Sequence, residues 1–111
     1  METMIEQYYQ GEEGFDTLID EDGFCAYRVD DNKNFYVGHV FMSPDKRKNS
    51  DKFFNKIRFR TKALGAERIV GDLFLNVHNM KGYNNKVTVF LLNGFKIIDV
   101  NDKCITVMKE L

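Results

Sequence analysis

The sequence predicts an α/β fold, because strand-like and helix-like patterns both occur and follow one another along the chain. Apolar positions recur at helical spacing at Phe53, Phe54, Ile57, Thr61 and Leu64. Ser50 is the expected N-cap of this helix and Gly65 its C-terminal glycine. Before and after the helix, apolar runs rich in aromatic and β-branched residues are typical of strands. With 111 residues, 10 Phe, 5 Tyr and a hydrophobic fraction of 43%, the chain is expected to form one folded domain over residues 1–111.

Before the helix we expect a short helix at residues 3–9, a short strand at Phe15–Ile19 and a hairpin. The hairpin strands are Phe24–Val29 and Phe35–Met42, joined by a turn of Asp, Asn and Lys residues. Strict alternation along the second hairpin strand would put its side chains on two faces. One face would carry Phe35, Val37, His39 and Phe41, and the other Tyr36, Gly38, Val40 and Met42.

After the helix the sequence predicts three further strands and one ambiguous segment. The strands are Arg68–Val77, Lys96–Val100 and Cys104–Met108, the last two joined by a turn at Asn101 and Asp102. The ambiguous segment is Tyr83–Leu92. Its β-branched residues favour a strand, whereas the spacing of Val87, Phe90 and Leu91 suits a helix packed on one face.

Composition and cysteine usage narrow the class of protein. A net charge of −1 argues against nucleic acid as the main ligand. Cys25 and Cys104 lie in apolar runs without the paired spacing of a zinc site or a disulfide framework, so buried reduced thiols and no metal site are expected. No stretch reaches the roughly 18 apolar residues of a membrane span, and the start lacks the basic and apolar parts of a leader. The sequence therefore predicts a cytoplasmic protein with no membrane association.

A cationic loop lies between the second hairpin strand and the helix. Lys46, Arg47, Lys48 and Lys52 fall close together there in a chain whose net charge is near zero. The free amides and partial positive charge of a helix N-terminus favour an anion at this place. The loop is therefore a candidate phosphate-binding segment, with a solvated turn as the alternative interpretation.

Several local motifs follow one another in an order that matches a known family. Pro44-Asp45-Lys46-Arg47 precedes the helix, Ala63-Leu64-Gly65-Ala66 ends it, Asn84 or Asn85 follows the next strand, and Gly94-Phe95 precedes the two last strands. In this order the motifs resemble the GNAT family of acyl-CoA-dependent N-acetyltransferases, over residues 23–111. The resemblance implies a mixed, mostly antiparallel central sheet flanked by helices, with a shortened N-terminal part at residues 1–22.

The resemblance also implies binding of acetyl-CoA and transfer of its acetyl group to an amine. The backbone of the strand before the loop would hold the pantetheine arm as an added strand, and the loop would hold the phosphates. The implied cofactor-binding residues are Val40, Phe41, Met42, Arg47, Lys48, Asn49, Ser50, Asp51, Lys52, Asn84 and Asn85. His39 is the only histidine of that strand, which contains no carboxylate, and it is the candidate base for the amine proton. Tyr83 is the candidate source of a hydroxyl.

Two departures from the family pattern favour an alternative function. The pyrophosphate loop of the family has glycines where this chain has Ser50 and Lys52, and Phe90 takes the place of the usual tyrosine acid. The alternative is a catalytically inactive GNAT-like module that acts as a binding or structural protein. Small proteins of this kind look similar to bacteriophage-encoded ones, some of them linked to virion assembly, and such a protein would lie in the host cytoplasm or the virion.

The acceptor side of the expected site is incomplete in the sequence. The acidic residues of segment 2–22 would suit a cationic amine acceptor. Because the N-terminal part is short, the acceptor groove is open, absent, or completed by a protein partner or a second copy of the chain.

Overall fold

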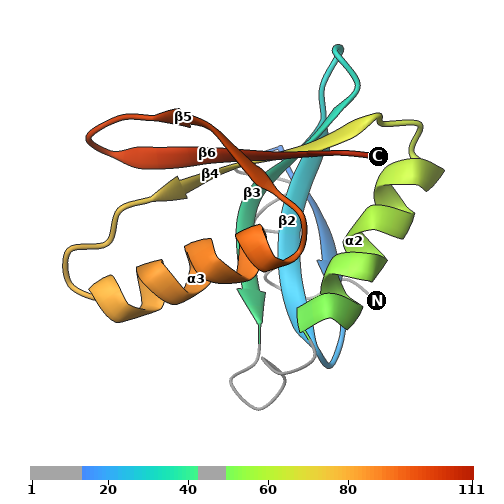
Figure 1. Ribbon diagram of the computed structural model, residues 1–111. Helices are drawn as coiled ribbons and strands as arrows, with labels where there is room; N and C mark the ends of the chain where they lie inside the picture. Colours follow the sequence, from blue (N-terminus) through green and yellow to red (C-terminus); the bar gives the residue numbers. More distant parts are fainter. Residues whose placement is uncertain (1–13, 43–49) are drawn as a thin grey trace.

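The computed structural model describes residues 14–42 and 50–111. Within them, six strands form a single sheet in the order β1-β2-β3-β4-β6-β5 (Figure 1). The strands are β1 (Asp16–Ile19), β2 (Gly23–Val29), β3 (Asn34–Met42), β4 (Arg68–Phe74), β5 (Lys96–Val100) and β6 (Cys104–Glu110), and the helices are α2 (Ser50–Ala63) and α3 (Met80–Leu92). The short helix expected at residues 3–9 lies outside the described residues.

The sheet is mixed and mostly antiparallel, as predicted. β3 and β4 are parallel, and the other neighbouring pairs are antiparallel. A parallel pair needs a crossover connection, and α2 is the helix of that crossover. The helix ends at a glycine in the left-handed region, Gly65 at φ 77°, which confirms the expected C-terminal glycine.

Both helices pack on the same face of the sheet (Figure 1). Phe54 of α2, Phe90 of α3 and Phe95 after α3 form a cluster of edge-on rings, with centroids 4.9–5.7 Å apart. Phe90 is 1% exposed to solvent. This cluster joins the two helices to each other and to the apolar face of the sheet, on which Phe35 is also fully buried.

The ambiguous segment Tyr83–Leu92 forms a helix, as part of α3. α3 begins after Asn79, whose side chain accepts a hydrogen bond from the Gly82 amide at 3.0 Å and so caps the first turn. The prediction of a strand up to Val77 was too long, because β4 ends at Phe74. Asn76 turns the chain there, since its side chain accepts a hydrogen bond from the His78 amide at 3.1 Å.

The two cysteines are free thiols buried in the sheet, as predicted. Burial raises the pKa of the Cys25 thiol to about 12. Cys25 therefore stays protonated at neutral pH and is part of the core, not a nucleophile.

We expect Phe90→Tyr to destabilise the protein. The new hydroxyl would enter the aromatic cluster, where burying an unpaired hydroxyl costs about 1–3 kcal/mol. Urea unfolding measures the change. The matched control is Phe59→Tyr, the same substitution on α2 at a residue that is 77% exposed, which should leave stability almost unchanged. Equal stabilities of the two variants would contradict the packing described for Phe90.

Candidate functional site

β3 and β4 are paired over only part of their length. Their parallel pairing ends where Val37 faces Gly71. Beyond this point β3 runs on to Met42 and β4 to Phe74, and Figure 1 shows the two strands diverging. Backbone groups of both strands that face this gap therefore have no partner in the opposite strand.

A β-bulge in β3 marks the start of the divergence. Val37 and His39 face consecutive residues of β2, so Gly38 is the extra residue. A bulge bends its strand and increases the local twist. Gly38 lies against the ring of Phe15, and a Cβ at this position would be 2.6 Å from the Phe15 Cζ atom. The absence of a side chain at Gly38 allows the ring to pack over the bulge.

The expected alternation of side chains along β3 was wrong beyond this bulge. Phe35 and Val37 are buried on the helix-covered face, but the next residue on that face is Val40, which is 8% exposed. His39 lies on the opposite face, where its ring meets the edge of Phe15 with a centroid distance of 6.4 Å. The physical reason is the extra residue, which shifts the alternation by one position, so that Val40 takes the place on the helix-covered face that was expected for His39.

Two cavities meet between the diverging strands. The first has a volume of about 530 Å³ and the second of about 330 Å³, and both are lined by Val40, Phe74 and Lys86. The first also contacts His39 on one face of the sheet and Leu73 on the other. Residues of both faces of the sheet therefore line the first cavity, and the second cavity lies beside it along the start of α3.

The second cavity has apolar walls, and polar side chains also line it, namely Asn76, Asn79, Tyr83, Asn85 and Lys86. Phe41 and Phe74, at the ends of the diverging strands, are 56% and 63% exposed and line this cavity together with Val89 of α3. Tyr83 and Asn85 supply polar atoms from the first turns of the helix. An apolar pocket with few polar groups is typical of small-molecule sites.

A hydrogen-bonded carboxylate, that of Asp72, also lines the first cavity. Asp72 of β4 accepts hydrogen bonds from the Tyr36 hydroxyl at 2.8 Å and from the Thr106 hydroxyl at 2.5 Å. Burial and the hydrogen bond to Asp72 raise the pKa of Tyr36 to about 12. Asp72 thus ties three neighbouring strands together at the point where the sheet opens.

Sequence reasoning missed Asp72 and Lys86. A signal for Asp72 was present, since it is the one charged residue in the apolar run from Ile69 to Leu75. Lys86 lines both cavities, and burial lowers the pKa of its ammonium group, although the residue as a whole is exposed. No pattern distinguished Lys86 from other helix lysines, because its position depends on where α3 crosses the gap.

The structure brings several predicted site residues together. His39 lines the first cavity, Phe41, Tyr83 and Asn85 line the second, and Val40 lines both. Asn84 is exposed and lies outside the linings of these cavities, so of the two alternatives Asn85 is the one beside the gap.

The candidate phosphate loop lies largely outside the described residues. This applies to Arg47, Lys48 and Asn49, whereas Met42 is the last residue of β3. Ser50 was expected to be the N-cap, with Asp51 as the first helical residue, but α2 already includes Ser50. Asp51 and Lys52 are exposed in its first turn.

Residues 14–42 and 50–111 hold no group of three or more His, Cys, Asp or Glu residues that could bind a metal ion. Among these residues there is also no helix of sufficient length and hydropathy to span a membrane.

Solved acetyltransferase structures share this fold. A putative GNAT-family acetyltransferase from Desulfovibrio desulfuricans matches with a TM-score of 0.68, 8% identity, and coverage of 96% of this chain and 76% of that one. The PaiA N-acetyltransferase of Thermoplasma acidophilum in complex with coenzyme A matches with a TM-score of 0.66 and 14% identity. The match covers 97% of this chain and 69% of that one. An acetyltransferase of Bacillus subtilis in complex with CoA matches with a TM-score of 0.65 and 12% identity. This match covers 96% of this chain and 82% of that one. The chain therefore has the fold of GNAT acetyltransferases.

Other matches extend well beyond this chain. It spans 58% of a GNAT-family acetyltransferase from Listeria monocytogenes, at a TM-score of 0.57 and 13% identity over 81% of this chain. It spans 59% of the N-acetyltransferase PseH from Campylobacter jejuni, at a TM-score of 0.61 and 14% identity over 80% of this chain. No family model and no curated protein sequence matches the chain.

The contact between Tyr36 and Asp72 predicts a dependence of stability on alkaline pH. The pKa of Tyr36 is about 12 in the folded protein and 10.0 ordinarily, so the unfolded chain loses this proton first. The stabilisation is complete below pH 10 and is lost as the pH rises toward 12. We expect the difference in unfolding free energy between wild type and Tyr36→Phe to shrink over this interval, measured by urea unfolding.

The variant Asp72→Asn is the companion measurement, because it removes the carboxylate charge while keeping a hydrogen-bond acceptor. It should flatten the same pH profile. A wild-type profile that runs parallel to that of Tyr36→Phe from pH 9 to 12 would show that the hydrogen bond is absent in solution.

Proposed function

We propose that this chain is an acetyl-CoA-dependent N-acetyltransferase that transfers an acetyl group to an amine. The observation that carries the proposal is the opening between β3 and β4, where two neighbouring cavities share Val40, Phe74 and Lys86 and where residues of both faces of the sheet line the first cavity. A long thioester substrate and an amine could meet in such an opening from opposite sides. The shared fold supports this proposal, since some of the solved structures contain CoA.

The helix-covered side of the opening is suited to the pantetheine arm of acetyl-CoA. β3 beyond Val37 is not paired with β4, so backbone groups of Val40, Phe41 and Met42 can bind the amides of the arm as an added strand would. Tyr83 and Asn85 lie on the α3 side of the same cavity. The cationic loop residues Arg47 and Lys48, with Asn49 to Lys52, would bind the phosphates by charge.

The open side is suited to the amine. In the proposed step, the amine nitrogen attacks the thioester carbonyl carbon, a C–N bond forms, the C–S bond breaks and CoA leaves as a thiolate. His39 takes the proton from the amine nitrogen, directly or through a water, and Tyr83 donates a proton to the thiolate. Phe90 takes no part, because it is buried in the aromatic cluster and has no proton to donate.

A binding function without catalysis is the second candidate. It is favoured by Ser50 and Lys52 at the family's glycine positions and by Phe90 at its tyrosine position. Main-chain amides approach phosphates most closely at glycine, so side chains at these two positions weaken the expected phosphate binding by the loop. In this alternative the chain would act through a partner, and acetyl-CoA would not bind.

Binding of acetyl-CoA is tested by thermal unfolding. A ligand that binds only the native state raises the melting temperature by mass action, and at 100 times its Kd it adds about 2.7 kcal/mol. We expect acetyl-CoA and CoA to raise the melting temperature and inorganic pyrophosphate to have a smaller effect. Asn85→Trp should block the second cavity and abolish the shift, whereas Thr88→Trp, at an exposed position of α3 outside the cavity linings, should retain it. If CoA produces no shift, the binding module replaces the enzyme as our interpretation.

Transfer is tested at His39. If His39 is the base, His39→Gln should lower kcat by about 100-fold or more, as expected for loss of a general base, and should preserve the thermal shift with acetyl-CoA. A primary alkylamine can serve as acceptor, with release of free thiol as the readout. His78→Gln is the matched control, because His78 is exposed in the loop after β4 and lines neither cavity. An unchanged kcat in His39→Gln would assign the proton transfer to another group.

A further inference from the structure

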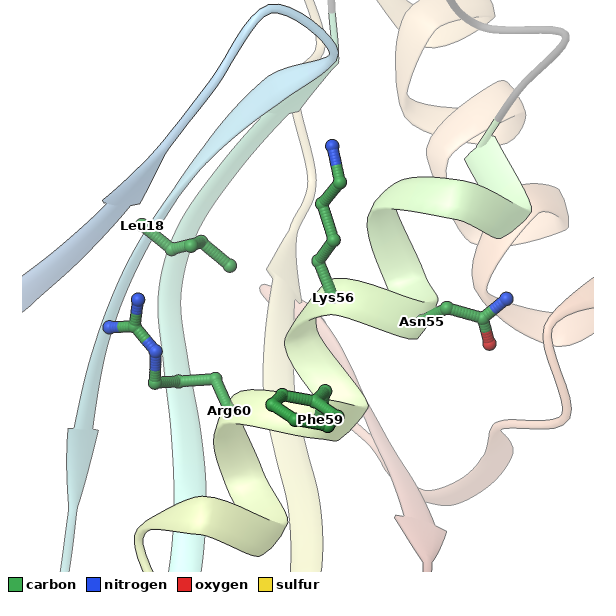
Figure 2. Close-up of a pocket in the computed structure, with 5 residues that line it drawn as sticks. All are labelled: Leu18, Asn55, Lys56, Phe59 and Arg60. Carbon is green, nitrogen blue, oxygen red and sulfur yellow. The ribbon is translucent and has the colours of Figure 1, made fainter.

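A separate surface hollow lies between β1 and α2, away from the opening between β3 and β4. It has a volume of about 370 Å³ and is lined by Leu18, Asn55, Lys56, Phe59 and Arg60. Figure 2 shows Leu18 pointing toward α2, Arg60 extending from the helix toward the strands, Lys56 extending along the helix side, and Asn55 pointing to the opposite side. We call this hollow the β1–α2 groove.

Phe59 is the apolar centre of the exposed face of α2. It is 77% exposed, whereas the helix buries the opposite face through Phe53, Phe54, Ile57 and Thr61. Lys56 and Lys62 are three residues before and after it, and Lys52 is seven residues before it, so all three share its side of the helix. An ordinary solvent-exposed helix face carries polar and charged side chains. The face of α2 described here differs because it also exposes a large aromatic side chain among its cations.

The charge around the groove is uneven. Lys56 is already paired, since its Nζ atom lies 2.6 Å from Asp20 and 2.9 Å from Asp22 at the turn after β1. Arg60 donates a hydrogen bond to the Tyr27 hydroxyl at 2.7 Å. Among the ion pairs of the described residues, none involves Lys52, Arg58 or Lys62, and these three side chains are exposed. The outer face of α2 is therefore cationic, while carboxylates border the groove at the turn.

We propose that the β1–α2 groove and the outer face of α2 bind an acidic peptide segment of a partner protein. The segment would place one large apolar side chain against Leu18 and Phe59, and its carboxylates beside Arg58 and Lys62. Phenylalanine and arginine are both enriched at protein–protein interfaces. The lining offers one aromatic side chain, Phe59, whereas proteins that bind single-stranded nucleic acids stack successive bases on several, so a peptide with one apolar anchor fits the groove better.

The test is fluorescence anisotropy of a labelled peptide with a central Phe flanked by Asp on both sides. We expect wild type to bind it, with affinity that falls as NaCl is raised, because exposed charges are screened. Phe59→Ala and the double variant Arg58→Glu, Lys62→Glu should each weaken binding at least about tenfold. Leu92→Ala is the matched control, since Leu92 is an apolar residue of α3 that is 80% exposed, and it should bind as wild type does.

Three results would overturn the proposal. These are absence of peptide binding, equal binding by Phe59→Ala and wild type, and tighter binding of single-stranded DNA or RNA than of the peptide. Because the substituted side chains are exposed, circular dichroism and thermal unfolding should confirm that the variants fold. The interaction is independent of acetyl-CoA binding, so the thermal shift with CoA should persist in Phe59→Ala whatever the peptide result.

Discussion

The architecture of the candidate site depends on a single limit to strand pairing. β3 and β4 are held together only as far as Val37 and Gly71, and the bulge at Gly38 then turns β3 away. A sheet that stayed paired at this position would leave no space in its centre, since neighbouring strands lie about 4.8 Å apart. The cavities, the exposed aromatics at their mouth and the position of α3 across the gap all follow from this early end of pairing.

The opening leaves the middle of the sheet in need of other support, and two kinds of contact supply it. On the helix-covered face, the rings of Phe54, Phe90 and Phe95 fill the space between the helices. On the open face, Asp72 links β4 to β3 through Tyr36 and to β6 through Thr106. Apolar packing on one side and a hydrogen-bonded carboxylate on the other therefore hold the diverging strands in place.

Much of the fold followed from local patterns, whereas the site followed only in part. The helix of residues 50–63 and the terminal hairpin were predictable because their periodicity and turn residues agree. The face occupied by His39 was not, because a bulge has no reliable signature when Gly38 also fits a regular strand. The helical state of Met80–Leu92 depends on packing of Phe90, a tertiary contact that propensity does not include. The hydrogen-bond partners of Asp72, Tyr36 and Thr106, are distant from it in sequence, so no local pattern indicates its role.

The packing of Phe15 over the bulge links two parts of the chain that are far from each other in sequence. Because a Cβ at position 38 would occupy the space of that ring, any side chain introduced there must displace Phe15 from its contacts with Tyr36 and Arg28. Related chains should therefore vary at these two positions together, with a larger residue at one accompanied by a smaller residue at the other. A pair of such positions would allow the bulge, and with it the opening of the sheet, to be recognised in sequences that resemble this one only weakly.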